Sequence, residues 1–208
     1  METPGEYRIT SIEQLRAMLG EPHPVACRKL LDALDDRAID FVRRSPFLVL
    51  GTADTEGNQD VSPKGGEPGF VQVADNETLL VPDRKGNKLL FGLQNILANP
   101  RVGMIFMVPG TDETLRVNGK AELSADPALL ERLSLRGVPA QLAIRVSVRE
   151  CFFHCAKAFM RSQLWKPESW PQRIKFSWGE YLAAKAAMGT EAAEKIDQSV
   201  ERDYKENL

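Results

Sequence analysis

The chain has 208 residues, of which 43% are hydrophobic and 27% charged, and its formal net charge is −2. This composition is typical of a folded globular protein and excludes a disordered or fibrous chain. The small negative charge excludes attraction to nucleic acid or acidic membranes through bulk charge, so any anion must be bound locally.

The expected compartment follows from what the sequence lacks. No apolar stretch approaches the roughly 20 residues that span a bilayer, so we expect no membrane partner. The N-terminal METPGEYRIT has neither the basic nor the apolar region of a signal peptide. Cysteine occurs three times, an odd number. We therefore expect a cytoplasmic protein with reduced thiols.

Helical patterns occupy the first forty-odd residues. SIEQLRAMLG (11–20) begins with a capping-box pattern at Ser11 and Gln14 and ends on Gly20, a residue common just past a helix. DDRAIDFVRRS (35–45) predicts a second helix with an apolar side suited to packing.

From residue 47 the pattern changes to short apolar runs with turn residues between them. Closely spaced strands with few helices indicate a barrel or a sandwich. Two helical patterns, 87–98 and 126–135, interrupt the series. The predicted strands are FLVLGTA (47–53), QDVSPKGG (59–66), GFVQVA (69–74), ETLLVP (77–82), RVGMIFMVP (101–109), ETLRVNGKAEL (113–123) and LAIRVSV (142–148).

Helical patterns return in the last third of the chain. They are HCAKAFMRSQLW (154–165), SWGEYLAAKAAMG (177–189) and TEAAEKIDQSVERDYKENL (190–208). We therefore expect three parts: a helical extension over 1–40, a central β domain over 41–165 and a helical tail over 166–208.

NKLLFGLQNILANP (87–100) predicts an amphipathic helix with Asn87 as its N-cap and Pro100 as its stop. The free N–H groups of such a helix point outward at its start. The predicted apolar face consists of Leu89, Leu90, Leu93, Ile96 and Leu97.

Three cations lie at the N-terminus of this predicted helix: Arg84, Lys85 and Lys88. The helix dipole disfavours positive charge at its N-terminus. Free amides, the dipole and converging cations together suit a phosphate group, and Gly86 permits a tight turn. Neither a P-loop nor a GxGxxG pattern is present, so a solvated basic turn is the alternative.

A further cation, Lys64, follows a strand in DVSPKGG, beside Ser62 and a pair of glycines. Pro63 cannot donate a ladder hydrogen bond, so this strand must end, bulge or lie at a sheet edge. Such an irregularity leaves room for a ligand near the backbone. An ordinary hairpin end is the alternative.

SPKG, DRKGNK, NPRVGMIF and LRVNG, in this order, resemble the pyridoxamine 5′-phosphate oxidase-like, FMN-binding split-barrel family. The segment CFFHCAKAFMRSQLW is similar to a branch of uncharacterised flavoproteins within it. The resemblance spans roughly residues 41–165, which would be the FMN-binding domain. It implies a mainly β (α+β) fold, a six-stranded Greek-key split barrel with flanking helices at both termini. It also implies a homodimer with FMN at the subunit interface.

The resemblance implies where the cofactor phosphate would lie. Arg84, Asn87 and Lys88 would hold it with help from Lys85, and Asp83 completes the cofactor-binding set of this segment. These residues would therefore be ligands of FMN rather than surface residues.

The flavin ring would be lined by Ser62, Pro63 and Lys64, whose amine would stabilise negative charge on reduced flavin. Arg116 and Asn118 would reach toward the flavin of the partner subunit.

Cys151, His154 and Cys155 form a C-x2-H-C pattern. A structural zinc site normally needs four ligands, and no second cluster accompanies this one, although His23 and Cys27 lie close together in sequence. We expect no metal, and a strand-to-helix junction with ordinary thiols explains the pattern.

Lys157, Arg161 and Trp165 recur at i, i+4 and i+8 in the helix predicted over 154–165. The three side chains would complete the flavin pocket. The alternative is an exposed basic face with Trp165 in the core, and the resemblance favours the pocket.

The expected function is that of an FMN-dependent oxidoreductase acting on a small-molecule substrate. Flavin carries the chemistry, so no catalytic acid or base is assigned. The Arg-x-His-type segment by which the true oxidase binds its substrate is not found, so another substrate is expected. The alternatives are a non-catalytic protein that binds flavin, deazaflavin or haem, and a nucleic-acid-binding barrel, which the absence of a basic stripe disfavours.

Overall fold

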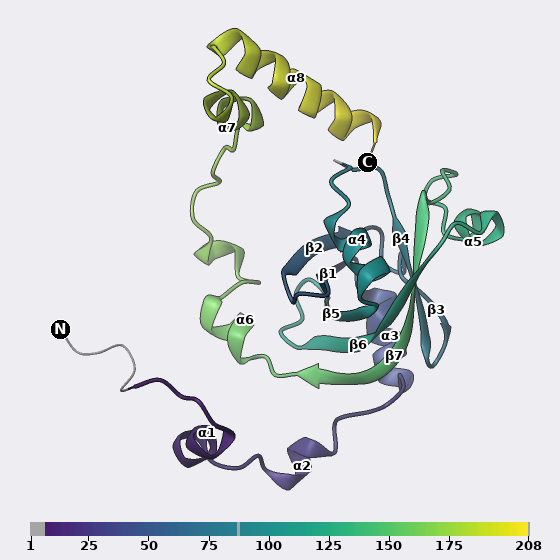
Figure 1. Cartoon of the computed structure of the whole chain (residues 1–208), viewed down its shortest axis with the longest axis vertical. Helices are drawn as coiled ribbons and strands as arrows, with labels where there is room; N and C mark the ends of the chain where they lie inside the picture. The colour runs from purple at the N-terminus through teal and green to yellow at the C-terminus, as the bar shows by residue number, and fades with distance from the viewer. Residues whose placement is uncertain (1–6, 87, 208) are drawn as a thin grey trace.

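The computed structural model of the chain describes residues 7–86 and 88–207. A curled β-sheet with two protruding helical arms makes up the molecule (Figure 1). The strands are β1 (Phe47–Ala53), β2 (Gln59–Gly65), β3 (Gln72–Asp75), β4 (Thr78–Asp83), β5 (Arg101–Met107), β6 (Thr114–Ser124) and β7 (Leu142–His154). The helices are α1 (Ile12–Leu19), α2 (Pro24–Cys27), α3 (Asp36–Arg44), α4 (Phe91–Ala98), α5 (Pro127–Arg132), α6 (Lys157–Ser162), the 3₁₀ turn η1 (Pro167–Ser169), α7 (Trp178–Lys185) and α8 (Thr190–Glu206).

The described strands form one antiparallel sheet in the order β2-β1-β5-β6-β7-β4-β3. This confirms the mainly β, α+β class with helices at both ends. The sheet has seven strands rather than the six that the resemblance implied, and each corresponds to one of the seven apolar runs in the sequence. The strands at its two ends, β2 and β3, pair with β1 and β4 only, which leaves the sheet open.

Strand β2 is an edge strand, which explains why it tolerates Pro63. Pro63 lies opposite Val49, and Ser62 lies opposite Leu50. Because side chains alternate along a strand, Ser62 and Lys64 share the inner face with Leu50, whereas Pro63 lies on the outer face.

The core fills the inner face of the sheet. Phe106, Leu48 and Leu115 are among its largest fully buried side chains. The helix α3 closes one side of it through Ala38 and Val42, since both belong to the same buried cluster. Core residues therefore begin at Leu34, upstream of the boundary predicted at residue 40.

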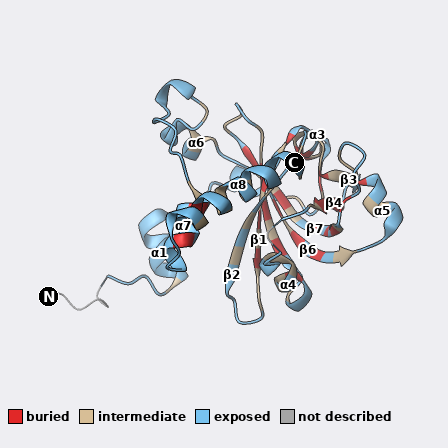
Figure 2. Ribbon diagram, turned by 90° about the horizontal axis from the view of Figure 1, so that it is seen from above, coloured by how far each residue is buried: buried red, intermediate tan, exposed pale blue. Residues whose placement is uncertain are grey.

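Both ends of the chain form arms that extend beyond the sheet, on the side where β2 and β1 lie (Figures 1 and 2). The N-cap predicted at Ser11 is confirmed, because the backbone N–H of Gln14 donates to Ser11 Oγ at 3.2 Å. The side chain of Gln14 reaches one residue further back, since its Oε1 accepts from the Thr10 N–H at 2.8 Å. Gly20 ends this helix with a φ of 78°.

Two predicted helices have different limits in the structure. The helix expected from residue 87 begins at Phe91, because Lys88 and Leu90 have φ values of 59° and 60° and so interrupt a right-handed helix. The helix expected to reach Trp165 ends at Ser162, because Gln163 adopts the left-handed conformation. Among the described residues, no helix is both long enough and apolar enough to cross a membrane.

Candidate functional site

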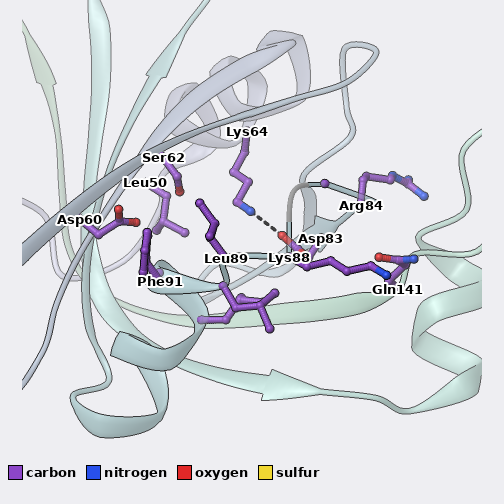
Figure 3. A pocket seen from close by; sticks show the side chains of 14 residues that line it. Leu50, Asp60, Ser62, Lys64, Asp83, Arg84, Lys88, Leu89, Phe91 and Gln141 are labelled. Carbon is purple, nitrogen blue, oxygen red and sulfur yellow. Dashed lines mark hydrogen bonds and ion pairs between the residues drawn. The ribbon is translucent and has the colours of Figure 1, made fainter. Parts of the chain in front are cut away.

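A cavity of about 240 Å³ opens between β2, the segment that follows β4, and the start of α4. Arg84, Lys88 and Gln141 lie together at one end of it, and Asp60 and Ser62 lie beside Leu50 and Phe91 at the other (Figure 3). The polar lining comes from Asp60, Ser62, Lys64, Asp83, Arg84, Lys88 and Gln141. The apolar lining comes from Leu50, Leu89, Leu90, Phe91 and Leu93.

Lys64 and Asp83 form an ion pair across the cavity, so two predicted site residues from separate strands meet there. Their side chains are 21% and 15% exposed, respectively, which places the pair largely out of water. The paired carboxylate of Asp83 holds the Lys64 amine in one position and offsets its charge. The pair therefore fixes a cation at the wall of the cavity without adding net charge to it.

Arg84 is anchored to the loop after α5. Its Nη2 donates to the carbonyl oxygen of Leu133 at 2.6 Å, and its Nη1 donates to that of Val138 at 3.2 Å. Partial burial lowers the pKa of the guanidinium below its ordinary value, but the group stays charged at neutral pH. A guanidinium has five N–H donors, so three remain for a ligand.

The remaining cations of this segment differ in their contacts. Lys88 is exposed and lines the cavity, and Figure 3 shows its amine beside Gln141. Lys85 points elsewhere, since its Nζ donates to Asn207 Oδ1 at 3.0 Å. The predicted ligand Asn87 lies outside the described residues.

Arg116 and Asn118 lie on the outer face of the sheet, away from this cavity. They line a separate hollow of about 330 Å³ together with Val49, Val61 and Ile105. The Asn118 amide donates to Glu150 Oε1 at 2.8 Å, and Arg116 stacks over the Phe152 ring at 5.4 Å. Within one chain, these two residues therefore do not join the cations around Lys64.

Lys157, Arg161 and Trp165 do not form the single helical face that the spacing predicted, because α6 ends before Trp165. The Trp165 indole donates to the Thr111 carbonyl at 2.9 Å and stacks on Phe159 with ring centroids 5.6 Å apart. Lys157 and Arg161 are exposed on the C-terminal arm.

The C-x2-H-C segment separates into one buried and one exposed thiol. The Cys151 Sγ donates to the Ala33 carbonyl at 3.2 Å, and burial, followed by the charges of Asp35, Asp32 and Glu150, raises the pKa of Cys151 to about 11. Cys155 is exposed. In residues 7–86 and 88–207, no three His, Cys, Asp or Glu side chains gather as a metal site would require.

Two polar residues of the cavity were not among the predicted site residues. Asp60 precedes Ser62 by two positions on β2, so strand alternation was a signal that places both on one face. Gln141 comes from the segment just before β7, and its place in the cavity depends on tertiary structure. No local pattern marks it.

The anchored Arg84 and the exposed Lys88 lie at one end of the cavity, and the Ser62 hydroxyl lies beside apolar side chains at the other (Figure 3). The chain is thus an open antiparallel barrel with a cavity, lined in part by cations, at its edge strand. Residues 34–155 match the family model described as pyridoxamine 5′-phosphate oxidase, and the chain belongs to this family. A search of curated protein sequences finds no match.

Solved structures that match part of this chain share little sequence with it. HupZ of Group A Streptococcus is 18% identical, with a TM-score of 0.46 over 58% of this chain and 93% of its own. A putative pyridoxamine 5′-phosphate oxidase from Lactobacillus delbrueckii is 21% identical, with a TM-score of 0.46 over 59% and 95%. An FMN-binding protein from Syntrophomonas wolfei is 9% identical, with a TM-score of 0.46 over 69% and 96%. These TM-scores lie below 0.5, and the likenesses assign no ligand to this chain.

Proposed function

We propose that this protein is an FMN-dependent oxidoreductase of the cytoplasm whose small-molecule substrate differs from pyridoxamine phosphate. The observation that carries the proposal is the cavity beside β2, which brings Lys64, Arg84 and Lys88 together in a chain of the oxidase family. Two exposed free thiols, Cys27 and Cys155, agree with a reducing compartment.

In the proposed complex, Lys88 and Arg84 hold the FMN phosphate. Arg84 enters the complex already oriented by its two carbonyl acceptors, so binding costs little side-chain entropy there. Lys88 contributes a mobile charge at the mouth of the cavity. Charge-assisted hydrogen bonds of this kind are about twice as strong as neutral ones.

The apolar wall, formed by residues such as Leu50, Leu90 and Phe91, accepts one face of the flavin ring. When bound, FMN supplies the hydride-accepting centre, and the protein supplies orientation and electrostatics. The Lys64 amine donates hydrogen bonds beside the ring, and Asp83, which offsets its charge, holds that amine in place. The Ser62 hydroxyl faces the same space and supplies a hydrogen bond to the polar edge of the ring.

We further propose that the protein acts as a homodimer with FMN at the subunit interface. This accounts for the position of Arg116 and Asn118 on the face of the sheet that does not carry their own chain's cavity. Across a two-fold axis, residues of one outer face reach the site of the partner.

The test is addition of FMN to the purified protein, followed by reduction under anaerobic conditions. Saturable binding with bleaching of the visible flavin bands by NADH, NADPH or another donor supports an oxidoreductase. Saturable binding without reduction by any donor instead favours a non-catalytic carrier. Absence of saturable FMN binding would overturn the proposed function.

A further inference from the structure

The two terminal arms leave large apolar side chains without cover. In α1, no residue is buried, and Ile12, Met18 and Leu19 are exposed. In the C-terminal arm, Phe176, Trp178 and Tyr181 form an aromatic cluster with ring centroids between 5.1 and 6.2 Å apart. These three side chains are 60%, 42% and 48% exposed. An exposed apolar patch of this kind marks an interaction surface.

The aromatic cluster stands on a well-built helical hairpin. Ser177 Oγ donates to Asp197 Oδ2 at 2.6 Å, and the Gly179 N–H donates to Asp197 Oδ1 at 2.7 Å, which ties the start of α7 to α8. A Cβ at Gly179 would lie 1.9 Å from the carbonyl oxygen of Ala193, so the helices pack as closely as glycine permits. The cluster is therefore presented by a defined structure.

The arm is nevertheless held to the barrel at only two places by the hydrogen bonds of the described residues. Trp165 donates to the Thr111 carbonyl near the start of the arm, and Lys85 donates to Asn207 at its end. Between these two contacts the arm follows an arc that stands away from the barrel (Figure 1). Both views place it on the same side as β2 and β1.

The outer face of the sheet on that side is hollow and partly apolar. Gly51 of β1 lies directly opposite Gly103 of β5, so two neighbouring positions have no side chain. Val49, Val61 and Ile105 surround this floor, and Val61 is 64% exposed. A second surface that brings side chains into the hollow would bury both the glycine floor and the valines.

Charge complements the apolar pattern. Beyond the glycine floor a hollow is lined by Arg101, Lys120 and Arg149 and also by Asp54 and Glu56, which leaves one excess positive charge. Arg101 and Lys120 lie directly opposite each other across β5 and β6. Like charges in such a pair destabilise a sheet unless an anion approaches. The helix α8 has six carboxylates against three cations. With Glu180 and Lys185 of α7 added, the α7–α8 hairpin is net negative, whereas the part of the arm before it is net positive.

We propose that a second copy of this chain sits between the outer sheet face and the arms, so that each subunit's α7–α8 hairpin clasps the other. The inference rests on the homodimer proposed above and adds which segment holds it together. A second copy fits because the chain itself carries both halves of the contact, the hollow face with its excess positive charge and the aromatic, acidic α7–α8 hairpin. A two-fold axis then buries both halves twice in one closed assembly.

The test measures the dimer dissociation constant of the full chain by sedimentation. The triple variant Phe176→Ala/Trp178→Ala/Tyr181→Ala should weaken the dimer at least about 100-fold, as expected for central aromatic contacts. Gly179→Leu, which separates α7 from α8, should weaken it as well. Val138→Ala and Leu97→Ala remove exposed apolar side chains away from the arms and should leave it unchanged.

The outcomes separate the two proposals. The clasp is supported if the wild type is a dimer and the triple variant dimerises more weakly. The FMN affinity per site, measured at saturating protein, should then be the same for both proteins. If the triple variant dimerises as tightly as the wild type, the clasp is overturned and the proposed homodimer stands. A monomeric wild-type protein overturns both, while FMN binding by that monomer would retain the cofactor assignment.

Discussion

Replacing Lys88 with alanine separates phosphate recognition from folding. Lys88 is exposed, so its removal should change the free energy of unfolding by no more than about 0.5 kcal/mol. In the proposed complex its amine makes a charge-assisted hydrogen bond to phosphate, whose net value is about 1.5–3 kcal/mol. Since each 1.4 kcal/mol is a tenfold change, Lys88→Ala should weaken FMN binding by roughly 10- to 100-fold.

Arg84→Ala should give a different signature. It removes the donors to the carbonyls of Leu133 and Val138, so it should lower the free energy of unfolding by about 1–3 kcal/mol in addition to weakening FMN binding. The pair of variants thus distinguishes a mobile phosphate ligand from one that also joins β4 to the loop after α5.

Riboflavin, which has the flavin ring without the phosphate, is the control ligand. Quenching of flavin fluorescence gives the affinity for both ligands, and urea unfolding gives the stability. We expect Lys88→Ala to lower FMN affinity while leaving riboflavin affinity unchanged. Lys166→Ala, an exposed cation of the C-terminal arm, is the matched control and should change neither. Equal losses for FMN and riboflavin, or an unchanged FMN affinity in Arg84→Ala/Lys88→Ala, would refute the phosphate assignment.

Further predictions concern thiols and the helical hairpin. A thiol reagent at pH 8 should modify Cys27 and Cys155 quickly, whereas Cys151, with its pKa raised to about 11, should react only upon unfolding; three equally fast thiols would contradict its burial. Asp197→Ala should release the start of α7 and so increase the rate of amide hydrogen exchange at Gly179. An unchanged exchange rate would contradict this role of Asp197. Hydrogen bonds from Ser177 and from the Gly179 N–H lower the pKa of Asp197, so its contribution to stability is present above the unfolded pKa of about 3.9 and is lost as pH falls through the folded value. Circular dichroism should therefore show the hairpin loosening only below about pH 4.

The strands were the most predictable feature of this fold. β1 has the limits predicted from FLVLGTA, and β2 coincides with the predicted return strand except for its last residue. Pro63 correctly predicted an irregular or edge position, because a missing N–H donor is a local property. These features depend on alternation and turn residues, which the sequence states directly.

The start of α4 was not predictable from spacing alone. Leu89 and Leu90 have helical periodicity, yet they line the cavity because the backbone at Lys88 and Leu90 turns left-handed. No glycine or asparagine at those two positions signals that conformation. Arg84 and Lys88 of the predicted set line the cavity, whereas Lys85 contacts Asn207, so tertiary contacts determine where each cation lies.

Those tertiary contacts join residues distant in sequence. Lys64 pairs with Asp83, Lys85 with Asn207, and Arg84 with two carbonyls some fifty residues downstream. The sequence identifies which side chains are charged, and only the packing of the strands and α5 determines which charges are already satisfied. The left-handed Gln163 that ends α6 likewise has no local signal in the sequence.

The visible absorption spectrum of the purified protein, followed by mass identification of whatever is released on denaturation, tests the central claim most directly. We predict the two visible bands of oxidised flavin, either as purified or after addition of FMN, and release of FMN itself. A colourless protein that acquires no bound flavin spectrum with excess FMN would contradict the assignment of the cavity at Lys64, Arg84 and Lys88.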